Sequence, residues 1–300
     1  MIPAALGAAL RAARNRLVQA LDLEPSVAAL EAQVLLGHVL NRSRAYLLAH
    51  AEVTLSDSDQ AQYEALLTRR EHGEPIAYLL GEREFFGLTF RVTPDVLIPR
   101  PDTELLVTLA LALIPDEATW AVLELGTGSG AIAIAIATQR PKARVIAIDQ
   151  SGEALLVARD NALRLGATNL GFLQGDWFAP LAKGARFDLI VGNPPYSAEH
   201  DAHLSQGDLR FEPKAALTSG REGLDAIRAI VYKATHHITS SGCLLLEHGF
   251  EQGAACRKIF TEHGFQKIST HRDLAGQERV TTGRPTEVSE NFTELRDNLP

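Results

Sequence analysis

The chain has 300 residues, of which 46% are hydrophobic, and a formal net charge of −8 at pH 7. Its length and hydrophobic content exclude global disorder and predict two domains, or one large domain with an appendage. The acidic balance argues against a protein that binds by neutralising phosphates, so we expect no direct nucleic-acid partner.

Residues 1–80 predict a small helical domain. Their leucines recur at helical spacings of four and seven residues, at Leu6, Leu10, Leu17 and Leu21. Ser26 is a candidate cap for a second helix, and Asp57 or Ser58 is a candidate cap for a further one. We interpret the leucines as the core of a helical bundle.

Residues 81–99 predict a β-hairpin that links two domains. Aromatic and β-branched residues flank Gly87, which suits a turn. The prolines of the following segment, Ile98-Pro99-Arg100-Pro101, break regular structure. Asp102 or Thr103 can then begin a helix.

From residue 120 onward, the pattern alternates between strands and helices. Strands are expected at 120–125, 144–149, 170–174, 186–192 and 242–247. Helices are expected at about 130–139, 152–165, 223–239 and 251–263. This alternation predicts an α/β fold with a doubly wound parallel sheet. Residues 265–271 and 279–282 can close the sheet as an antiparallel pair. We assign residues 100–284 to this domain and the polar, acidic residues 285–300 to a flexible tail.

The cysteines, histidines and apolar segments predict a cytoplasmic protein without a metal site. Cys243 and Cys256 do not form a CxxC pair, and the histidines show no ligand-type spacing. No apolar segment approaches the roughly 18 residues of a membrane span, so we expect no membrane contact. Three arginines interrupt the apolar content near the N-terminus and argue against a signal peptide: Arg11, Arg14 and Arg16.

A glycine-rich loop, Gly126-Thr127-Gly128-Ser129-Gly130, follows the expected strand at 120–125. Glycine lets a ligand approach the backbone closely, and the helix that follows favours an anionic group. Asp149 ends the next strand, where a carboxylate can accept hydrogen bonds from ribose hydroxyls. These features suit both NAD and S-adenosylmethionine. Glu124 could accept from the ammonium of S-adenosylmethionine, which favours the second cofactor.

Asp176 and Trp177 follow the expected strand at 170–174. At the carboxyl end of a parallel sheet they would flank an adenine, with Trp177 offering an apolar face and Asp176 accepting from the exocyclic amine. A tryptophan that serves only the core is the alternative.

The strand at 186–192 ends in Asn193-Pro194-Pro195-Tyr196. The Asn193 side-chain oxygen and the Pro194 carbonyl can each accept one N–H of a planar nitrogen, and Tyr196 can pack on its flat face. The two prolines restrict φ, so the carbonyls point in fixed directions. A glycine loop followed by this motif indicates methyl transfer from S-adenosylmethionine to such a nitrogen. Catalysis would depend on proximity and orientation, without a base before attack.

These motifs together resemble the protein-(glutamine-N5) methyltransferases that modify class-1 peptide chain release factors. The resemblance covers about residues 8–284. It is carried by Gly73-Glu74-Pro75-Ile76, Arg83-Glu84-Phe85, Leu97-Ile98-Pro99-Arg100-Pro101-Asp102-Thr103-Glu104, Leu125-Gly126-Thr127-Gly128, Asp176-Trp177-Phe178, Asn193-Pro194-Pro195-Tyr196, Gly207-Asp208, Arg210-Phe211-Glu212-Pro213 and Leu245-Leu246-Glu247-His248-Gly249.

The resemblance implies a class I S-adenosylmethionine-dependent methyltransferase fold, Rossmann-like with a seven-stranded sheet, behind the helical domain. It implies that the enzyme methylates the glutamine of a Gly-Gly-Gln motif in a release factor, and we expect a monomer. The residues implied to contact the cofactor are Gly126, Thr127, Gly128, Ser129, Gly130, Asp149, Asp176, Trp177 and Asn193. The residues implied to hold the glutamine or shape the pocket lip are Asn193, Pro194, Pro195, Tyr196, Arg100, Pro101 and Glu104.

Three other functions remain open at this point. A methyltransferase acting on an exocyclic amine of adenine or guanine in nucleic acid is disfavoured by the net charge and by the absence of a Lys/Arg-rich stretch. An NAD-dependent oxidoreductase would leave the segment 193–196 without a role. A catalytically silent module that docks a partner through its helical domain would bind cofactor without turnover.

Overall fold

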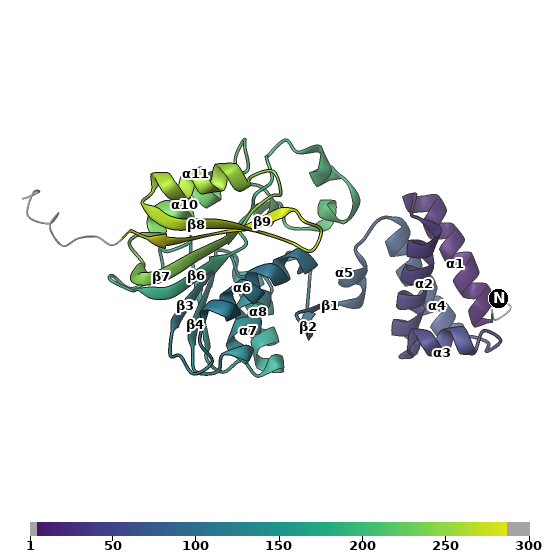
Figure 1. The fold of residues 1–300 in the computed structure, drawn as a ribbon. Helices are drawn as coiled ribbons and strands as arrows, with labels where there is room; N and C mark the ends of the chain where they lie inside the picture. Colours follow the sequence, from purple (N-terminus) through teal and green to yellow (C-terminus); the bar gives the residue numbers. More distant parts are fainter. Residues whose placement is uncertain (1–4, 287–300) are drawn as a thin grey trace, which may run out of the picture. The chain divides into compact units, whose positions relative to one another are not determined.

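The computed structural model describes residues 5–286 and divides the chain into two compact units. The first unit comprises the residues up to Glu82 together with His203–Phe211. The second unit comprises the remaining described residues (Figure 1). Within the described part of the chain, no helix is long and apolar enough to cross a membrane.

The first unit is helical. Its helices are α1 (Leu6–Leu21), α2 (Pro25–Leu40), α3 (Arg44–Ala49), α4 (Asp57–Glu71) and α5 (Ile76–Leu80). Two cap predictions were wrong. Helix α2 begins at Pro25, whose missing N–H costs nothing at the first helical position. Helix α4 is capped by Ser56, whose hydroxyl accepts from the Asp59 amide at 3.1 Å.

The core of the first unit is built from apolar side chains of all five helices. Leu6 and Leu17 of α1 are fully buried, while Leu10 and Leu21 are only partly buried against the same core. The helical spacing therefore identified the buried face of α1.

Arg70 at the end of α4 joins the segment 203–211 to the helices of the first unit. Its guanidinium is buried, with Nε 2.8 Å from Glu31 and Nη1 3.1 Å from Asp208. Arg210 donates from Nη2 to the His72 carbonyl at 2.8 Å. A Cβ at Gly73 would lie 1.6 Å from the same Nη2 atom, so only glycine leaves room for this contact.

A hairpin and a seven-stranded sheet form the frame of the second unit. The hairpin pairs β1 (Glu82–Phe85) with β2 (Leu88–Arg91), with Gly87 in the turn. The strands of the sheet are β3 (Ala121–Leu125), β4 (Arg144–Asp149), β5 (Leu170–Gln174), β6 (Phe187–Gly192), β7 (Ile238–Glu247), β8 (Phe265–Arg272) and β9 (Glu278–Pro285). Their order is β5-β4-β3-β6-β7-β9-β8.

The predicted α/β sheet is confirmed. β5, β4, β3, β6 and β7 pair in parallel, and β9 lies antiparallel between β7 and β8. Strand β9 extends to Pro285, so the tail predicted from residue 285 begins too early, and residues 287–300 lie outside the described part.

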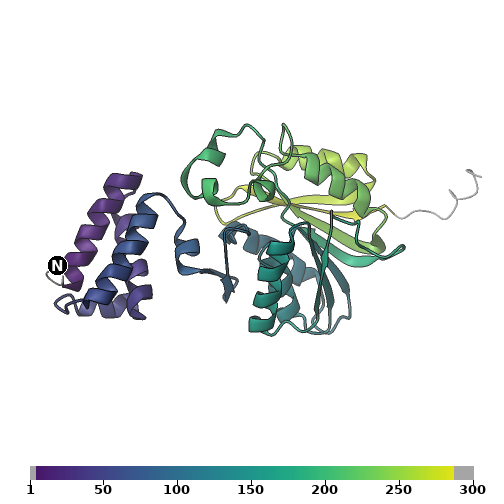
Figure 2. The same ribbon diagram turned by 180° about the vertical axis from the view of Figure 1, so that it is seen from behind.

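Helices cover both faces of the sheet (Figure 1), and Figure 2 shows the same two layers from behind. One layer contains η1 (Pro101–Thr103), α6 (Glu104–Leu113), α7 (Ala131–Gln139) and α8 (Gly152–Leu165). The other contains α10 (Asp225–Ala234) and α11 (Gly253–Glu262). Successive residues of a strand point to opposite faces of the sheet and belong to different hydrophobic cores. Val122 belongs to the core with α6 and α7, while Leu123 belongs to the core with α10 and α11.

The order of the strands reverses at β3, which lies between β4 and β6. In open α/β sheets, ligands bind beyond the carboxyl ends of the strands at such a reversal. Leu125 of β3 pairs with Gly192 of β6. The next residues, Gly126 and Asn193, therefore leave the sheet side by side.

We predict that Arg70→Met lowers the free energy of unfolding by about 3 kcal/mol, because it leaves Glu31 with a partly buried and uncompensated charge. The substitution should also make the segment 203–211 more sensitive to proteolysis. Urea denaturation and limited proteolysis measure the two effects. Arg69→Met is the matched control, since Arg69 pairs with Glu74 at the surface. Equal stability of the two variants would contradict the account.

Candidate functional site

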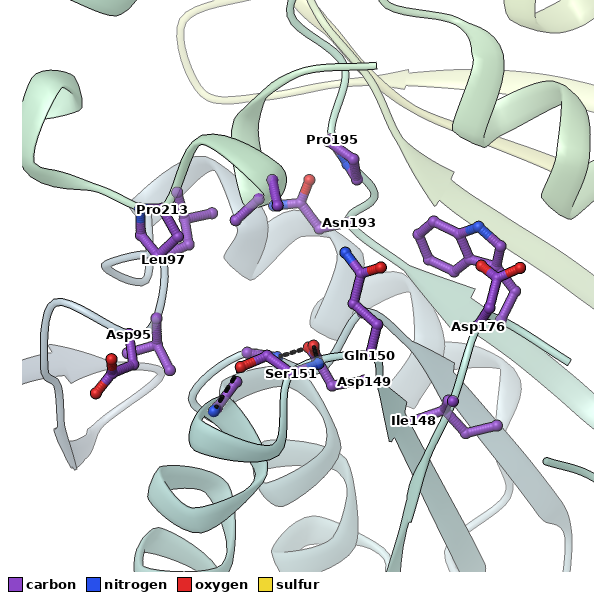
Figure 3. A pocket seen from close by; sticks show the side chains of 18 residues that line it. Asp95, Leu97, Ile148, Asp149, Gln150, Ser151, Asp176, Asn193, Pro195 and Pro213 are labelled. Carbon is purple, nitrogen blue, oxygen red and sulfur yellow. Dashed lines mark hydrogen bonds between the residues drawn. The ribbon is translucent and has the colours of Figure 1, made fainter. Parts of the chain in front are cut away.

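A cavity of about 260 Å³ opens in the second unit at the carboxyl ends of β3, β4, β5 and β6 (Figure 3). It is lined by Asp95, Val96, Leu97, Gly126, Gly128, Ile148, Asp149, Gln150, Ser151, Ala154, Gly175, Asp176, Trp177, Asn193, Pro195, Pro213, Ala215 and Ala216. Six of the residues predicted to bind a cofactor are among them: Gly126, Gly128, Asp149, Asp176, Trp177 and Asn193.

Asp149 fixes the geometry of this cavity. Its Oδ2 accepts from the Gly128 amide at 2.8 Å, and its Oδ1 accepts from the Ser151 amide at 3.0 Å. The carboxylate therefore ties the glycine loop to the end of β4. Each of its oxygens retains acceptor capacity for a hydroxyl of a ligand.

Three predicted cofactor residues of the glycine loop do not line the cavity. Thr127 and Ser129 are buried, and the Ser129 carbonyl accepts from Asn161 Nδ2 at 2.9 Å. A Cβ at Gly130 would lie 2.8 Å from Ile134 and 3.2 Å from Ala158. Glycine is needed there so that the loop can pack against α8. These three residues therefore stabilise the conformation of the loop from the side that faces away from the cavity.

Glu124 also lies behind the loop, and the expectation that it meets the ammonium of a cofactor was wrong. Its side chain is fully buried and does not line the cavity. Its Oε2 accepts from the Thr127 hydroxyl at 2.5 Å and from the Ala133 amide at 3.1 Å. Oε1 has no hydrogen-bond partner among the described residues. Burial raises the pKa of this carboxyl group to about 8.

Trp177 contributes an aromatic wall. Its φ of 48° lies in the left-handed region, which is unusual for a bulky residue. In this conformation the indole ring packs against the glycine loop. A Cβ at Gly126 would lie 3.6 Å from the ring. Asp176 lines the same side of the cavity. Backbone strain of this kind is concentrated at functional sites.

The segment 193–196 contributes Asn193 and Pro195 to the cavity lining, while Pro194 and Tyr196 lie outside it. Gln252 holds the far end of this segment, because its Nε2 donates to the Tyr196 carbonyl at 2.9 Å. Burial raises the pKa of the Tyr196 hydroxyl group, so this group stays protonated.

Three residues were predicted at the pocket lip, Arg100, Pro101 and Glu104, and none of them lines the cavity. Arg100 donates from Nη2 to Oε1 of the buried Glu212 at 2.6 Å, which fixes the residue next to Pro213 of the cavity wall. Glu104 does not line the cavity, so the structure does not place it at the lip. Its Oε1 accepts from the Phe86 amide at 3.0 Å and thereby stabilises the hairpin turn.

Sequence reasoning missed three parts of the wall. Gln150 and Ser151 directly follow Asp149, so their position after the strand was a usable signal. Residues 95–97 come from the linker behind the hairpin, and residues 213–216 come from a segment before α10. Leu97 and Pro213 belong to motifs that carry the family resemblance, but the mostly apolar sequences of the two segments do not indicate a cavity wall.

Family models match both units. One described as "PrmC N-terminal domain" matches residues 8–81, and one described as "Methyltransferase domain" matches residues 116–248.

The chain is 51% identical over 280 residues to the release factor glutamine methyltransferase of Vibrio cholerae, covering 92% of this chain and 96% of that one. It is 52% identical over 261 residues to the enzyme of the same name from Burkholderia pseudomallei, covering 85% and 92% of the two chains. The Escherichia coli enzyme of that name is 48% identical over 254 residues, covering 85% and 91%.

Solved structures show the likeness of the fold. A Thermus thermophilus 16S rRNA N2 G1207 methyltransferase, in complex with AdoMet and guanosine, matches with a TM-score of 0.51 at 20% identity, covering 68% of this chain and 49% of that one. A methyltransferase from Pyrococcus furiosus matches with a TM-score of 0.51 at 17% identity, covering 73% and 97%.

We predict that Glu124→Gln weakens the pH dependence of stability. The pKa of Glu124 is about 8 in the folded chain, against an ordinary value of 4.5 in the unfolded chain. Between these values the folded chain holds a proton that the unfolded chain releases, so stability falls as pH rises. Glutamine mimics the protonated acid, and its carbonyl oxygen can accept both existing hydrogen bonds.

Urea denaturation at pH 5 and pH 8 measures this effect. The wild type should lose more unfolding free energy than the variant across this window, by on the order of a few kcal/mol. Glu117→Gln at the surface is the control. Equal losses in wild type and E124Q would contradict the assignment of a buried, protonated Glu124.

Proposed function

Because this chain belongs to the release factor glutamine methyltransferase family, we propose that its cavity binds S-adenosylmethionine and that Asn193–Tyr196 holds the glutamine to be methylated. The chain is thus a protein-glutamine methyltransferase. We propose further that the acceptor atom is the side-chain nitrogen N5 of the glutamine in the Gly-Gly-Gln motif of class-1 release factors. Methylation at this position would modulate translation termination.

The cavity wall fits the parts of S-adenosylmethionine. Asp149 presents a fixed carboxylate to which ribose hydroxyls can donate. Ile148 and Trp177 supply the apolar surface that a flat base needs, and Asp176 can accept from its exocyclic amine. The glycine loop, with Gly126 and Gly128 in the wall, leaves space for the methionine part.

One observation supports this function more than any other, the pairing of Leu125 with Gly192. It brings the glycine loop and the start of the segment 193–196 to the same cavity wall. A residue that contacts the cofactor and a residue that orients the acceptor then come from adjacent strand ends. Two groups held in this way react as an intramolecular pair, which lowers the entropic part of the barrier.

The acceptor needs orientation because an amide nitrogen is a poor nucleophile, its lone pair being delocalised into the carbonyl. When bound, S-adenosylmethionine supplies a methyl group activated by the sulfonium. Asn193 Oδ1 and the Pro194 carbonyl each accept one N–H of the glutamine, and this directs the lone pair toward the methyl group. The nitrogen carries a positive charge after transfer, so its proton leaves without a base acting first.

We predict that Asp149→Ala raises the dissociation constant of S-adenosylmethionine by about 10- to 100-fold, since it removes hydrogen bonds to the ribose and loosens the glycine loop. Isothermal titration calorimetry measures the constant. Asp160→Ala on the outside of α8, where Asp160 pairs with Arg91, is the control. An unchanged constant for D149A would refute the role of this carboxylate.

Asn193→Ala tests the acceptor role. We expect methyl transfer from labelled S-adenosylmethionine to a purified class-1 release factor to fall by about 100-fold or more, because the acceptor loses its orientation. The affinity for cofactor, measured in parallel, should stay nearly unchanged. Near-normal turnover by N193A would remove Asn193 from the acceptor site, and absence of transfer by the wild type would refute the proposed substrate.

A further inference from the structure

Glu247, the last residue of β7, is a buried acid that the reaction described above does not use. Leu246 pairs with Gly192, so Glu247 leaves the sheet beside Asn193. Both side chains point to the face that α6 covers, because Val191 and Leu245 pack there. Glu247 is 1% exposed, and its Oε2 has no hydrogen-bond partner among the described residues. A carboxylate in such surroundings is costly unless neighbouring groups donate hydrogen bonds to it or pair with its charge.

Thr103 connects this acid to Asn193. It ends η1 and is 3% exposed, and its Oγ1 accepts from Asn193 Nδ2 at 3.2 Å. The Thr103 hydroxyl also interacts with the Glu247 carboxylate. An ionised carboxylate can only accept hydrogen bonds, so the proton of Thr103 must point toward Glu247. A lone pair of the Thr103 hydroxyl oxygen then faces Asn193. Asn193 must therefore donate from Nδ2 to Thr103, and its Oδ1 points away from Thr103.

Glu247 also faces the other end of the same segment, since the Tyr196 hydroxyl interacts with its carboxylate. The charged groups nearby are Arg279 of β9 and Asp102 of η1. Arg279 is already engaged, with Nη2 3.2 Å from Asp102 and Nε 3.1 Å from Asp273. Glu247 is therefore available to order Thr103 and Tyr196 while Arg279 is shared by two aspartates.

We propose that Glu247 is a positioning residue for the methyl acceptor: it orders the Thr103 hydroxyl, which locks the Asn193 side chain with Oδ1 toward the substrate amide. This inference rests on the proposed function, which assigns Asn193 to the acceptor. A reversed Asn193 would present its own N–H groups to the N–H groups of the glutamine and lose the hydrogen bond that orients it. We call this chain of contacts from Glu247 through Thr103 to Asn193 the lock. It therefore selects an amide as acceptor.

The lock depends on the charge of Glu247. Burial raises the pKa of this carboxyl group to about 7, against the opposing effects of Thr103, Arg279 and Tyr196, while the charge of Asp102 adds to the rise. A protonated carboxyl group can donate to Thr103, which permits the reversed orientation of Asn193. The rate of transfer should therefore fall below about pH 7, and neither an amide nor a sulfonium titrates in that range.

Two variants test the lock in the full-length enzyme with a release factor and S-adenosylmethionine. Thr103→Val should lower kcat about 10- to 100-fold with an unchanged dissociation constant for cofactor. Glu247→Gln offers both a donor group and an acceptor group at every pH, so its kcat should be independent of pH and equal to the low-pH value of the wild type. Thr108→Val on the exposed side of α6 and Glu262→Gln at the end of α11 are the controls. Wild-type kcat in T103V, or a retained acid limb in E247Q, would overturn the proposal.

A second measurement needs no release factor. NMR follows the exchange of the Asn193 side-chain amide protons with solvent, with S-adenosylhomocysteine added. Exchange should be about fivefold faster in T103V than in the wild type, because one hydrogen bond is lost. Exchange should also be faster in E247Q than in the wild type, although Thr103 is unchanged in this variant. Equal rates in all three proteins would overturn the lock, whereas a wild type that fails to methylate the release factor would refute only the proposed function.

Discussion

The parallel register between β3 and β6 is the constraint on which the site depends. Leu125 pairs with Gly192, so the glycine loop and the segment 193–196 start from adjacent points at one edge of the sheet. Backbone hydrogen bonds and two buried cores maintain this register. A shift by one residue would reverse the faces of β6 and would turn Asn193 away from α6 and Thr103. The chemistry of the site is therefore set by the packing of the sheet.

Two buried acids lie behind the cavity, one near the end of β3 and one at the end of β7. Glu124 of β3 binds the glycine loop through Thr127 and Ala133. Glu247 of β7 faces Thr103 and, through it, Asn193. Both carboxyl groups have raised pKa values because burial disfavours their charge. Such groups lower stability and are tolerated where they give a loop one defined conformation.

Elements with a strong local pattern could be predicted from the sequence. The buried strands were recognisable as short apolar runs, and Asp149 was recognisable because it ends the strand that follows the glycine loop, about twenty residues further along the chain. Side-chain direction was not predictable, and so Glu104 was assigned to the pocket lip although it stabilises the hairpin. Residues 213–216 were missed because tertiary packing alone brings them to the cavity. The place of residues 203–211 in the helical unit depends on Arg70, whose partner Asp208 is distant in sequence.

The central claim is that two acceptors at one strand end select a side-chain amide for methylation. The most direct test is site-localised mass spectrometry of a release factor after incubation with the enzyme and S-adenosylmethionine. The experiment uses the natural factor and a variant whose Gly-Gly-Gln glutamine is replaced by glutamate, which has the same shape but no N–H to donate. We predict one added methyl group on the glutamine nitrogen and none on the glutamate variant. Methylation of the glutamate variant, or of another residue in both factors, would contradict it.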